Sequence, residues 1–255
     1  MAPSEWRRID FISDLHLAED TPRSFEAWRI YLWNTPADAV FILGDLFEAW
    51  VGDDSRNQGF EARGAATLAH AATRCKLYFM VGNRDFLLGA SMLTACGMEG
   101  LADPTVLTAF GQRTLLTHGD AWCIGDLAYQ QFRTQVRDPA WQAQVLSRPL
   151  AERRSMARSL RSESERAATD PLGPWVDIDV ATALRSMATH EASTLVHGHT
   201  HRPTSAPLAP GFMRHVLSDW ELDHGPASRA EVMRWDAHRW VRLSPADAVS
   251  RLDQA

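Results

Sequence analysis

The chain has 255 residues, of which 45% are hydrophobic and 23% are charged, and its net charge is −6. This composition is that of a globular protein and excludes collagen, coiled-coil and intrinsically disordered chains. No apolar run approaches the roughly 18 residues of a membrane span, and we expect no secretory signal in the polar first residues. The mild acidity argues against a nucleic-acid partner, and three cysteines without a C-x-x-C spacing favour a reducing compartment.

Three apolar runs in the first third of the chain each end in polar residues. They cover 9–13, 39–43 and 77–81, and their β-branched and aromatic residues are typical of buried strands. Helical periodicity lies between them. One helix is predicted to begin at Thr21-Pro22, with Thr21 as the N-cap, and another to cover about 59–74. Strands that alternate with helices predict parallel βαβ units and an open α/β sheet.

The second half of the chain predicts further strands and one long helical stretch. A hairpin is expected over 105–117, a strand over 193–196, and late antiparallel strands over 213–217, 231–235 and 239–243, with a turn at Asp236-Ala237. The stretch between Cys123 and Pro174 has no strand signal and is rich in arginine. We therefore predict a single domain over 1–255 with a helical lid insertion at about 123–175.

Possible metal ligands follow five successive strand ends. They are Asp14, His16, Asp45, Asn83, His118, His197 and His199. Because open α/β folds place their sites at the carboxyl ends of the strands, we expect these side chains to meet. Carboxylates, imidazoles and an amide oxygen without thiols suit Mn²⁺, Fe²⁺ or Zn²⁺. Seven ligands are too many for one tetrahedral ion and about right for two ions that share a carboxylate.

The spacing of two ligand pairs supports this interpretation, although each residue alone has a plainer one. Asp14 and His16, like His197 and His199, are two residues apart, so an extended backbone would turn both members of a pair toward one site. Taken singly, an aspartate or asparagine after a strand is more often a turn or cap residue. A lone histidine is more often a hydrogen-bonded loop residue, and the joint pattern is what favours a metal centre.

Five motifs resemble, in order, those of the calcineurin-like binuclear metallophosphoesterases. They are Asp14-x-His16, Gly44-Asp45, Gly82-Asn83-Arg84-Asp85, Thr117-His118-Gly119-Asp120 and Gly198-His199-Thr200-His201. The resemblance implies layered mixed β-sheets flanked by helices. The fuller wording at 13–17, 44–50, 82–89 and 197–203 is similar to that of the UDP-2,3-diacylglucosamine pyrophosphatases. These enzymes hydrolyse UDP-2,3-diacylglucosamine to UMP and 2,3-diacylglucosamine 1-phosphate (lipid X) in lipid A biosynthesis.

The resemblance also implies a role for each matching residue. One metal would be held by Asp14, His16, Asp45 and His199, and the other by Asp45, Asn83, His118 and His197. The metals would be two Mn²⁺ ions, with Fe²⁺ or Zn²⁺ as alternatives. The implied catalytic residues are Asp45, Asn83, Arg84 and His118. The implied substrate contacts are Asn83, Arg84, Asp126, Ser164 and His197, while two further contacts that are polar in the family fall on Ala168 and Pro171.

Arg84 stands where many phosphatases of the superfamily carry a histidine that protonates the leaving group. A sugar 1-phosphate has a second pKa of about 6 and departs without full protonation. A guanidinium there would stabilise charge that grows on the phosphate oxygens, which favours pyrophosphate cleavage over monoester cleavage. The alternative is a structural ion pair between Arg84 and Asp85. In the mechanism that the resemblance implies, water activated by two metals attacks the α-phosphorus without a covalent intermediate.

The lid segment carries apolar residues that would cover acyl chains or pack on the core. They are Trp122, Trp141, Val145, Leu146, Leu150, Met156 and Leu160. Its arginines would contact an anionic membrane surface or face solvent. We expect a cytoplasmic protein bound peripherally to the cytoplasmic face of the inner membrane. The alternatives are another phosphoesterase of this fold, such as a nuclease or a nucleotide or cyclic-nucleotide phosphodiesterase, and a metal-free scaffold.

Overall fold

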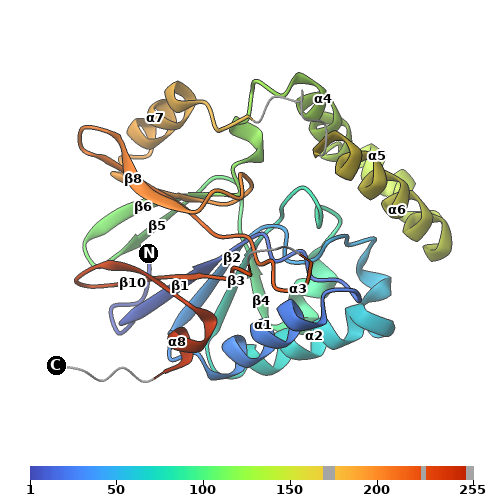
Figure 1. The fold of residues 1–255 in the computed structure, drawn as a ribbon, viewed down its shortest axis with the longest axis horizontal. Helices are drawn as coiled ribbons and strands as arrows, with labels where there is room; N and C mark the ends of the chain where they lie inside the picture. Colours follow the sequence, from blue (N-terminus) through green and yellow to red (C-terminus); the bar gives the residue numbers. More distant parts are fainter. Residues whose placement is uncertain (169–175, 225–227, 251–255) are drawn as a thin grey trace.

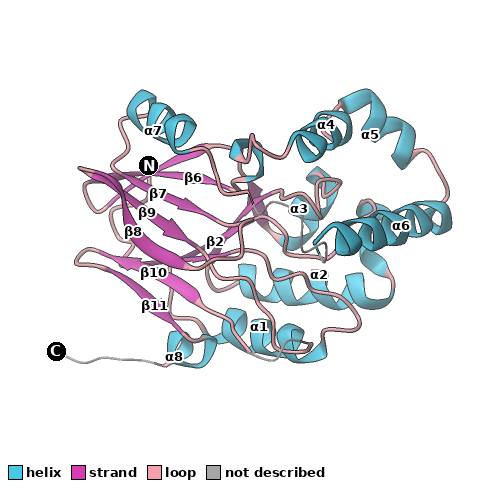
Figure 2. Cartoon of the chain, turned by 45° about the horizontal axis from the view of Figure 1, so that its top comes forward, coloured by secondary structure: helices cyan, strands magenta, loops and turns pink. Residues whose placement is uncertain are grey.

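The computed structural model describes residues 1–168, 176–224 and 228–250, and the side chains of its longest helix as far as Leu160. Two mixed β-sheets pack face to face, and helices cover their outer faces (Figures 1 and 2). The layered mixed sheets that the family resemblance implied are confirmed. The parallel βαβ units of an open sheet, predicted from the first third of the chain, are found in the first sheet, and the second sheet packs against it.

The first sheet has six strands in the order β11-β10-β1-β2-β3-β4. Four neighbouring strands are parallel: β1 (Arg8–Ile12), β2 (Ala39–Leu43), β3 (Lys76–Met80) and β4 (Met98–Gly100). Strand β10 (Val232–Asp236) pairs antiparallel with β1, and β11 (Trp240–Leu243) pairs antiparallel with β10. Its outer face is covered by α1 (Pro22–Asn34), α2 (Gly59–Ala72), α3 (Ala90–Cys96) and α8 (Pro245–Val249). In β2, Val40 and Ile42 face these helices while Phe41 and Leu43 face the second sheet, so the strand is apolar throughout.

The second sheet has five strands in the order β5-β6-β7-β9-β8. They are β5 (Thr105–Ala109), β6 (Gln112–Thr117), β7 (Thr194–His197), β9 (Phe212–Val216) and β8 (Thr204–Ala209), of which the central three are parallel. Helix α7 (Val180–Thr189) packs on its outer face through Ala183 and Met187, which contact a cluster that includes Leu115 and Leu195.

The helical insertion consists of α4 (Leu127–Val136), α5 (Pro139–Leu146) and α6 (Leu150–Ala168). It stands beyond one end of the two sheets, next to the loops that follow the strands (Figures 1 and 2). Two short 3₁₀ helices lie near it, η1 (Asp53–Asn57) and η2 (Asp120–Trp122). Among the described residues, none of the helices has both the length and the apolar character needed to cross a bilayer.

Two strands and one helix cap were not predicted correctly. Strand β4 was not predicted because it has only three residues. Strand β8 was not predicted because Pro207 interrupts its pattern, and this proline is tolerated because β8 lies at the edge of its sheet. Thr21 does stand at the N-cap position of α1, but its side chain makes no capping bond. Its hydroxyl instead accepts from the amide and donates to the carbonyl of Ala18.

Candidate metal centre

The loops that carry the predicted ligands leave the strands with a left-handed backbone. The φ angles are 54° at Asp14, 48° at His16, 53° at Asp45, 65° at His199 and 52° at His201. The prediction that each pair stays extended was therefore wrong. A left-handed conformation costs an ordinary residue roughly 1–2 kcal/mol and is best tolerated by Asn, Asp, His and Gly. The chain thus turns sharply directly after each strand, and this turn directs the side chains toward one another.

Two glycines allow the backbone to approach the carboxylates closely. A Cβ atom at Gly82 would overlap the carboxylate and amide of Asp45, and one at Gly198 would overlap the side chains of Asp14 and Ser13. Any larger residue would have to displace a buried carboxylate. The Gly82-Asn83 and Gly198-His199 pairs are therefore needed for the packing of the site, in addition to any role in a turn.

One group of ligand atoms is formed by Asp14, Asp45 and His118, which are all buried and lie within 4.8 Å of one another. His118 Nε2 is 3.8 Å from Asp45 Oδ2 and 2.9 Å from Asn83 Oδ1. His199 Nδ1 also lies 2.9 Å from Asn83 Oδ1. The structure thus brings together side chains that follow β1, β2, β3, β6 and β7, from both sheets.

A second group is formed by Asp14, His16 and His201, also within 4.8 Å of one another. The Nε2 atoms of His16 and His201 face each other at 3.2 Å, and His201 Nε2 is 3.5 Å from Asp14 Oδ1. His16 Nε2 is also 3.9 Å from Asp45 Oδ2. Two imidazole nitrogens turned toward each other beside buried carboxylates form a suitable site for a cation, because the lone pairs and the negative charge point to one place.

The structure does not place His197 with these groups. Its Nδ1 lies 2.8 Å from the carbonyl oxygen of Gly198, and its Nε2 accepts from Arg214 Nε at 2.9 Å, so both ring nitrogens are already used. Burial and the charge of Arg214 lower the pKa of His197 to about 3. His197 is the last residue of β7 and remains in the sheet, opposite Thr117. His201, which we did not assign as a ligand, lies beside Asp14 and His16.

A regularity in the sequence would have identified His201. The other predicted ligands all come after the last residue of their strand: Asp14 and His16 after β1, Asp45 after β2 and His118 after β6. Applied to β7, the same rule selects His199 and His201, which keep the spacing of two residues. His201 is therefore a further candidate ligand, and the metal-binding role of His197 stays a prediction.

The histidines of the site are oriented by hydrogen bonds on their other ring nitrogen. His16 Nδ1 donates to Glu48 Oε2 at 2.9 Å, and His118 Nδ1 donates to the carbonyl oxygen of Leu43 at 2.8 Å, so Nε2 of each faces the centre. Burial opposes the charged form of His118, but Asp45 and Asp120 outweigh it and raise its pKa to about 9. The carboxylate of Asp45, 3.8 Å from His118 Nε2, thus favours a cation at this position.

Asp85 holds the loops that follow β2 and β3 through hydrogen bonds to their backbone. It is fully buried, and its carboxylate accepts from the amides of Gly82 at 2.7 Å and Leu46 at 2.8 Å. Burial and the neighbouring Asp45 raise its pKa to about 6. The guanidinium of Arg84 lies 3.7 Å from Glu48 Oε1, and its amide donates to Asp45 Oδ1 at 2.8 Å. A structural pair between Arg84 and Asp85, the alternative for Arg84, stays a prediction.

The predicted substrate contacts in the lid are placed only in part. Asp126 is the N-cap of α4 and accepts from the amide of Tyr129 at 2.9 Å. Ser164 and Ala168 lie in α6 beyond the side chains that are described, and Pro171 lies outside the described residues. The substrate roles of Asp126 and Ser164 therefore stay predictions.

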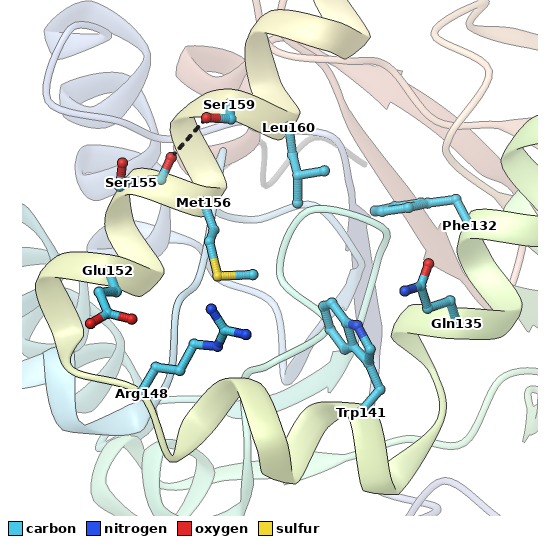
Figure 3. Close-up of a pocket in the computed structure, with 9 residues that line it drawn as sticks. All are labelled: Phe132, Gln135, Trp141, Arg148, Glu152, Ser155, Met156, Ser159 and Leu160. Atoms are coloured by element: carbon cyan, nitrogen blue, oxygen red, sulfur yellow. Dashed lines mark hydrogen bonds between the residues drawn. The ribbon is translucent and has the colours of Figure 1, made fainter.

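A pocket of about 570 Å³ lies within the helical insertion (Figure 3). Trp141, Met156 and Leu160 point into it, together with Phe132 of α4 (Figure 3). These include three of the lid residues that were predicted to cover acyl chains. Two others serve the alternative role, because Trp122 packs in the cluster between the second sheet and α7, and Val145 is buried.

Comparison with known proteins agrees with the arrangement of these loops. The family model described as calcineurin-like phosphoesterase matches residues 7–203. A protein of Chromobacterium violaceum named UDP-2,3-diacylglucosamine hydrolase is 44% identical over 85% of this chain and 92% of its own length. Proteins of the same name from Aromatoleum aromaticum and Chromohalobacter salexigens are 41% and 42% identical, over 89% and 94% of this chain and 92% and 94% of their own lengths. The chain therefore belongs to the calcineurin-like phosphoesterases and, within them, to the family of the UDP-2,3-diacylglucosamine hydrolases.

Proposed function

We propose that this protein is a metal-dependent hydrolase that cleaves the pyrophosphate bond of UDP-2,3-diacylglucosamine. The products are UMP and 2,3-diacylglucosamine 1-phosphate, as in lipid A biosynthesis. The observation that carries this proposal is a cluster of carboxylates, imidazoles and an amide oxygen, of which Asp14, Asp45 and His118 are buried, together with a largely apolar pocket in the helical insertion. The names of relatives whose alignments cover most of this chain support this substrate.

The donor set fits two divalent metal ions. Their ligands would be Asp14, His16, Asp45 and His199 for one ion and Asp45, Asn83, His118 and His197 for the other. His201 lies close to Asp14 and His16 and is a further candidate ligand. The absence of thiols favours two Mn²⁺ ions, with Fe²⁺ or Zn²⁺ as alternatives. Such ions lower the pKa of water and stabilise charge on phosphate oxygens.

The side chains around this set have separate tasks. Glu48 and the carbonyl of Leu43 keep Nε2 of His16 and His118 turned inward. Asp14 and Asp45 supply negative charge in a position that excludes water, because both are buried. Arg84 lies beside the set and is partly exposed, so its guanidinium can contact a phosphate oxygen of a bound substrate. We assign the attack to the α-phosphorus, with the sugar 1-phosphate as the leaving group.

The pocket of the helical insertion is suited to an acyl chain. Its walls include Phe132, Trp141, Met156 and Leu160, and its volume of about 570 Å³ is in the range of small-molecule sites. The guanidinium of Arg148 and the amide of Gln135 also point toward it (Figure 3), and Glu152, Ser155 and Ser159 complete its lining. A metal centre next to an apolar pocket favours a glycolipid substrate over a cyclic nucleotide or nucleic acid, which have no apolar chains to bury.

We also propose peripheral contact with the anionic cytoplasmic face of the inner membrane. Ile124 and Leu127, at the start of the insertion, are 47% and 71% exposed, and Arg148 is exposed near its pocket. Co-sedimentation with phosphatidylglycerol vesicles should decrease when salt is raised or when Leu127 is replaced by serine. Equal recovery in the supernatant with and without vesicles at low salt would contradict this contact.

One experiment tests the reaction directly. Purified protein is incubated with UDP-2,3-diacylglucosamine in ¹⁸O-labelled water, with and without Mn²⁺, and the products are identified by mass spectrometry. We expect Mn²⁺-dependent UMP that carries the label. Label in the sugar phosphate would show that the other phosphorus is attacked, and full activity after chelation would exclude the metal mechanism. A protein without bound metal and without turnover would be the metal-free scaffold.

A further inference from the structure

Two side chains of helix α4 and that of its C-cap residue converge on one buried carboxylate oxygen outside the proposed ligand set. Asp120 lies in η2, two residues after His118, and is fully buried. Its Oδ2 accepts from the hydroxyl of Tyr129 at 2.6 Å and from Arg133 Nε at 2.9 Å, and it lies 3.7 Å from Arg137 Nη2. Its Oδ1 is also buried and has no hydrogen-bond partner among the described residues.

The same helix also contacts the loops of two other proposed ligands. Arg137 Nη2 donates to the carbonyl oxygen of Gly82 at 2.9 Å, directly before Asn83. The ring of Tyr129 lies 5.6 Å from the ring of His199, measured between centroids. Helix α4 is thus in contact with the loops that carry His118, Asn83 and His199, and Asp120 lies where these contacts meet.

Helix α4 has little apolar attachment of its own. Val136 is its one buried residue, and Phe132 lines the pocket of the insertion. Ten helical residues with a single buried side chain gain little from apolar burial, so the position of α4 depends on its polar contacts. The contacts of Asp120 with Tyr129 and Arg133 therefore contribute much of what holds this helix in place.

We propose that Asp120 is a positioning residue that fixes helix α4 against the metal loops and so holds the pocket of the insertion in register with the reacting centre. This inference rests on the proposed function, because the pocket matters only for a substrate that reaches from the metals into the insertion. A small phosphodiester needs the metal loops but not the pocket. Loss of the Asp120 carboxylate should therefore affect the two kinds of substrate differently.

The test is the variant Asp120→Asn in the full-length protein with Mn²⁺. We expect kcat/KM for UDP-2,3-diacylglucosamine to fall about tenfold or more, because misplacement of a bound substrate by about 1 Å is costly. Turnover of bis-p-nitrophenyl phosphate and the bound Mn²⁺ should stay within about twofold of wild type. Hydrogen exchange should accelerate in residues 127–136 and not in β1–β3. Asp120→Glu, which keeps the charge, should recover part of the loss.

A double-mutant cycle shows whether Asp120 acts through α4. If it does, Arg133→Gln added to Asp120→Asn should cause little further loss, since contacting residues are not additive. The matched control is Asp138→Asn, which caps α5 through the amide of Trp141 and should change neither substrate, because asparagine is an equally good cap.

Two results would overturn the proposal. An equal loss with both substrates would show that Asp120 supports the metal centre itself, and unchanged exchange in α4 would show that it does not hold the helix. A wild-type enzyme that cleaves the small diester but not the glycolipid would instead refute the proposed substrate. The exchange experiment would still test the attachment of α4 in that case.

Discussion

The metal loops and the helical insertion are held in place by different kinds of contact. The loops lie between two packed sheets, with buried carboxylates, left-handed backbone and glycines that permit close approach. Among the described side chains of α4–α6, only Val136, Val145 and Arg153 are buried. The charged contacts that attach the insertion include those between Asp120 of η2 and α4 and those of Arg153 in α6.

Arg153 is the second of these attachments. Its guanidinium donates to the carbonyl of Val51 and pairs with the carboxylate of Asp54, in the loop between β2 and α2. Gly52, with a φ of 122°, makes room for it, because a Cβ there would overlap the guanidinium. The metal loops and the helical insertion are thus held in place by different contacts. A substitution that weakens the contacts of one region need not affect the other.

Asp45→Asn should have the largest effect. Asparagine tolerates the left-handed backbone of this position, so the variant removes the charge and leaves the fold. We expect turnover of both the glycolipid and bis-p-nitrophenyl phosphate to fall about 10³-fold or more, together with bound Mn²⁺ measured by elemental analysis. Hydrogen exchange in α4 and α6 should be unchanged. Retained metal and activity would mean that Asp45 does not belong to the centre.

Gly82→Ala tests whether the metal loops need the close approach of the Gly82 backbone to the Asp45 side chain. The added Cβ would displace the Asp45 carboxylate, so we expect both substrates to be affected alike and the unfolding free energy to fall by about 2–4 kcal/mol. Gly111→Ala is the matched control, since its φ is 75° but nothing lies within 4 Å of its Cβ position. Its cost in urea unfolding should be only about 1–2 kcal/mol, with full activity. Similar costs for the two variants would contradict the steric argument.

Arg153→Met tests the attachment of the insertion. The variant keeps the bulk and loses the charge, so we expect kcat/KM for the glycolipid to fall about tenfold while the small diester is unaffected. The control is Arg154→Met, whose partly exposed guanidinium lies 3.3 Å from Glu61 and which should change kcat/KM less than about twofold. If both substrates lost activity in Arg153→Met, the two regions would not be independently supported.

His215→Gln should show the smallest effect, seen only in the pH dependence of stability. His215 lies in β9 and stacks on Trp240, and burial and the charge of Arg242 lower its pKa to about 4 from the ordinary 6.5. The unfolded chain binds a proton below about pH 6.5 where the folded protein does not, so this stabilisation is present above that pH and is lost toward pH 4. Between pH 7.5 and 5, the variant should lose about 1–2 kcal/mol less than wild type in urea unfolding at constant Mn²⁺. Parallel losses would indicate that His215 is protonated in the fold.

The sequence was most informative where local pattern and long-range packing agree. Runs such as 39–43 are apolar throughout because both faces of β2 are buried, so this strand was predicted at its observed bounds. Strand β4, which has three residues, and strand β8, which contains Pro207, carry no such pattern in their sequences. Only their pairing with neighbouring strands identifies these two segments as strands. The convergence of Asp14, Asp45 and His118 was predictable from strand ends. The contact of His197 with Arg214 and the position of His201 beside Asp14 were not predicted, because they depend on where β7 ends and on packing between distant segments.

The left-handed backbone at five of the site residues limits which substitutions this centre tolerates. Residues that adopt such a conformation at low cost are Gly, Asn, Asp and His, and three of these types are also good metal ligands. A descendant that loses catalysis can therefore replace a ligand by asparagine or glycine with little cost in stability, while a β-branched residue would strain the turn itself. Inactive members of such a lineage should therefore carry Asn or Gly more often than other residue types at positions 14, 16, 45, 199 and 201.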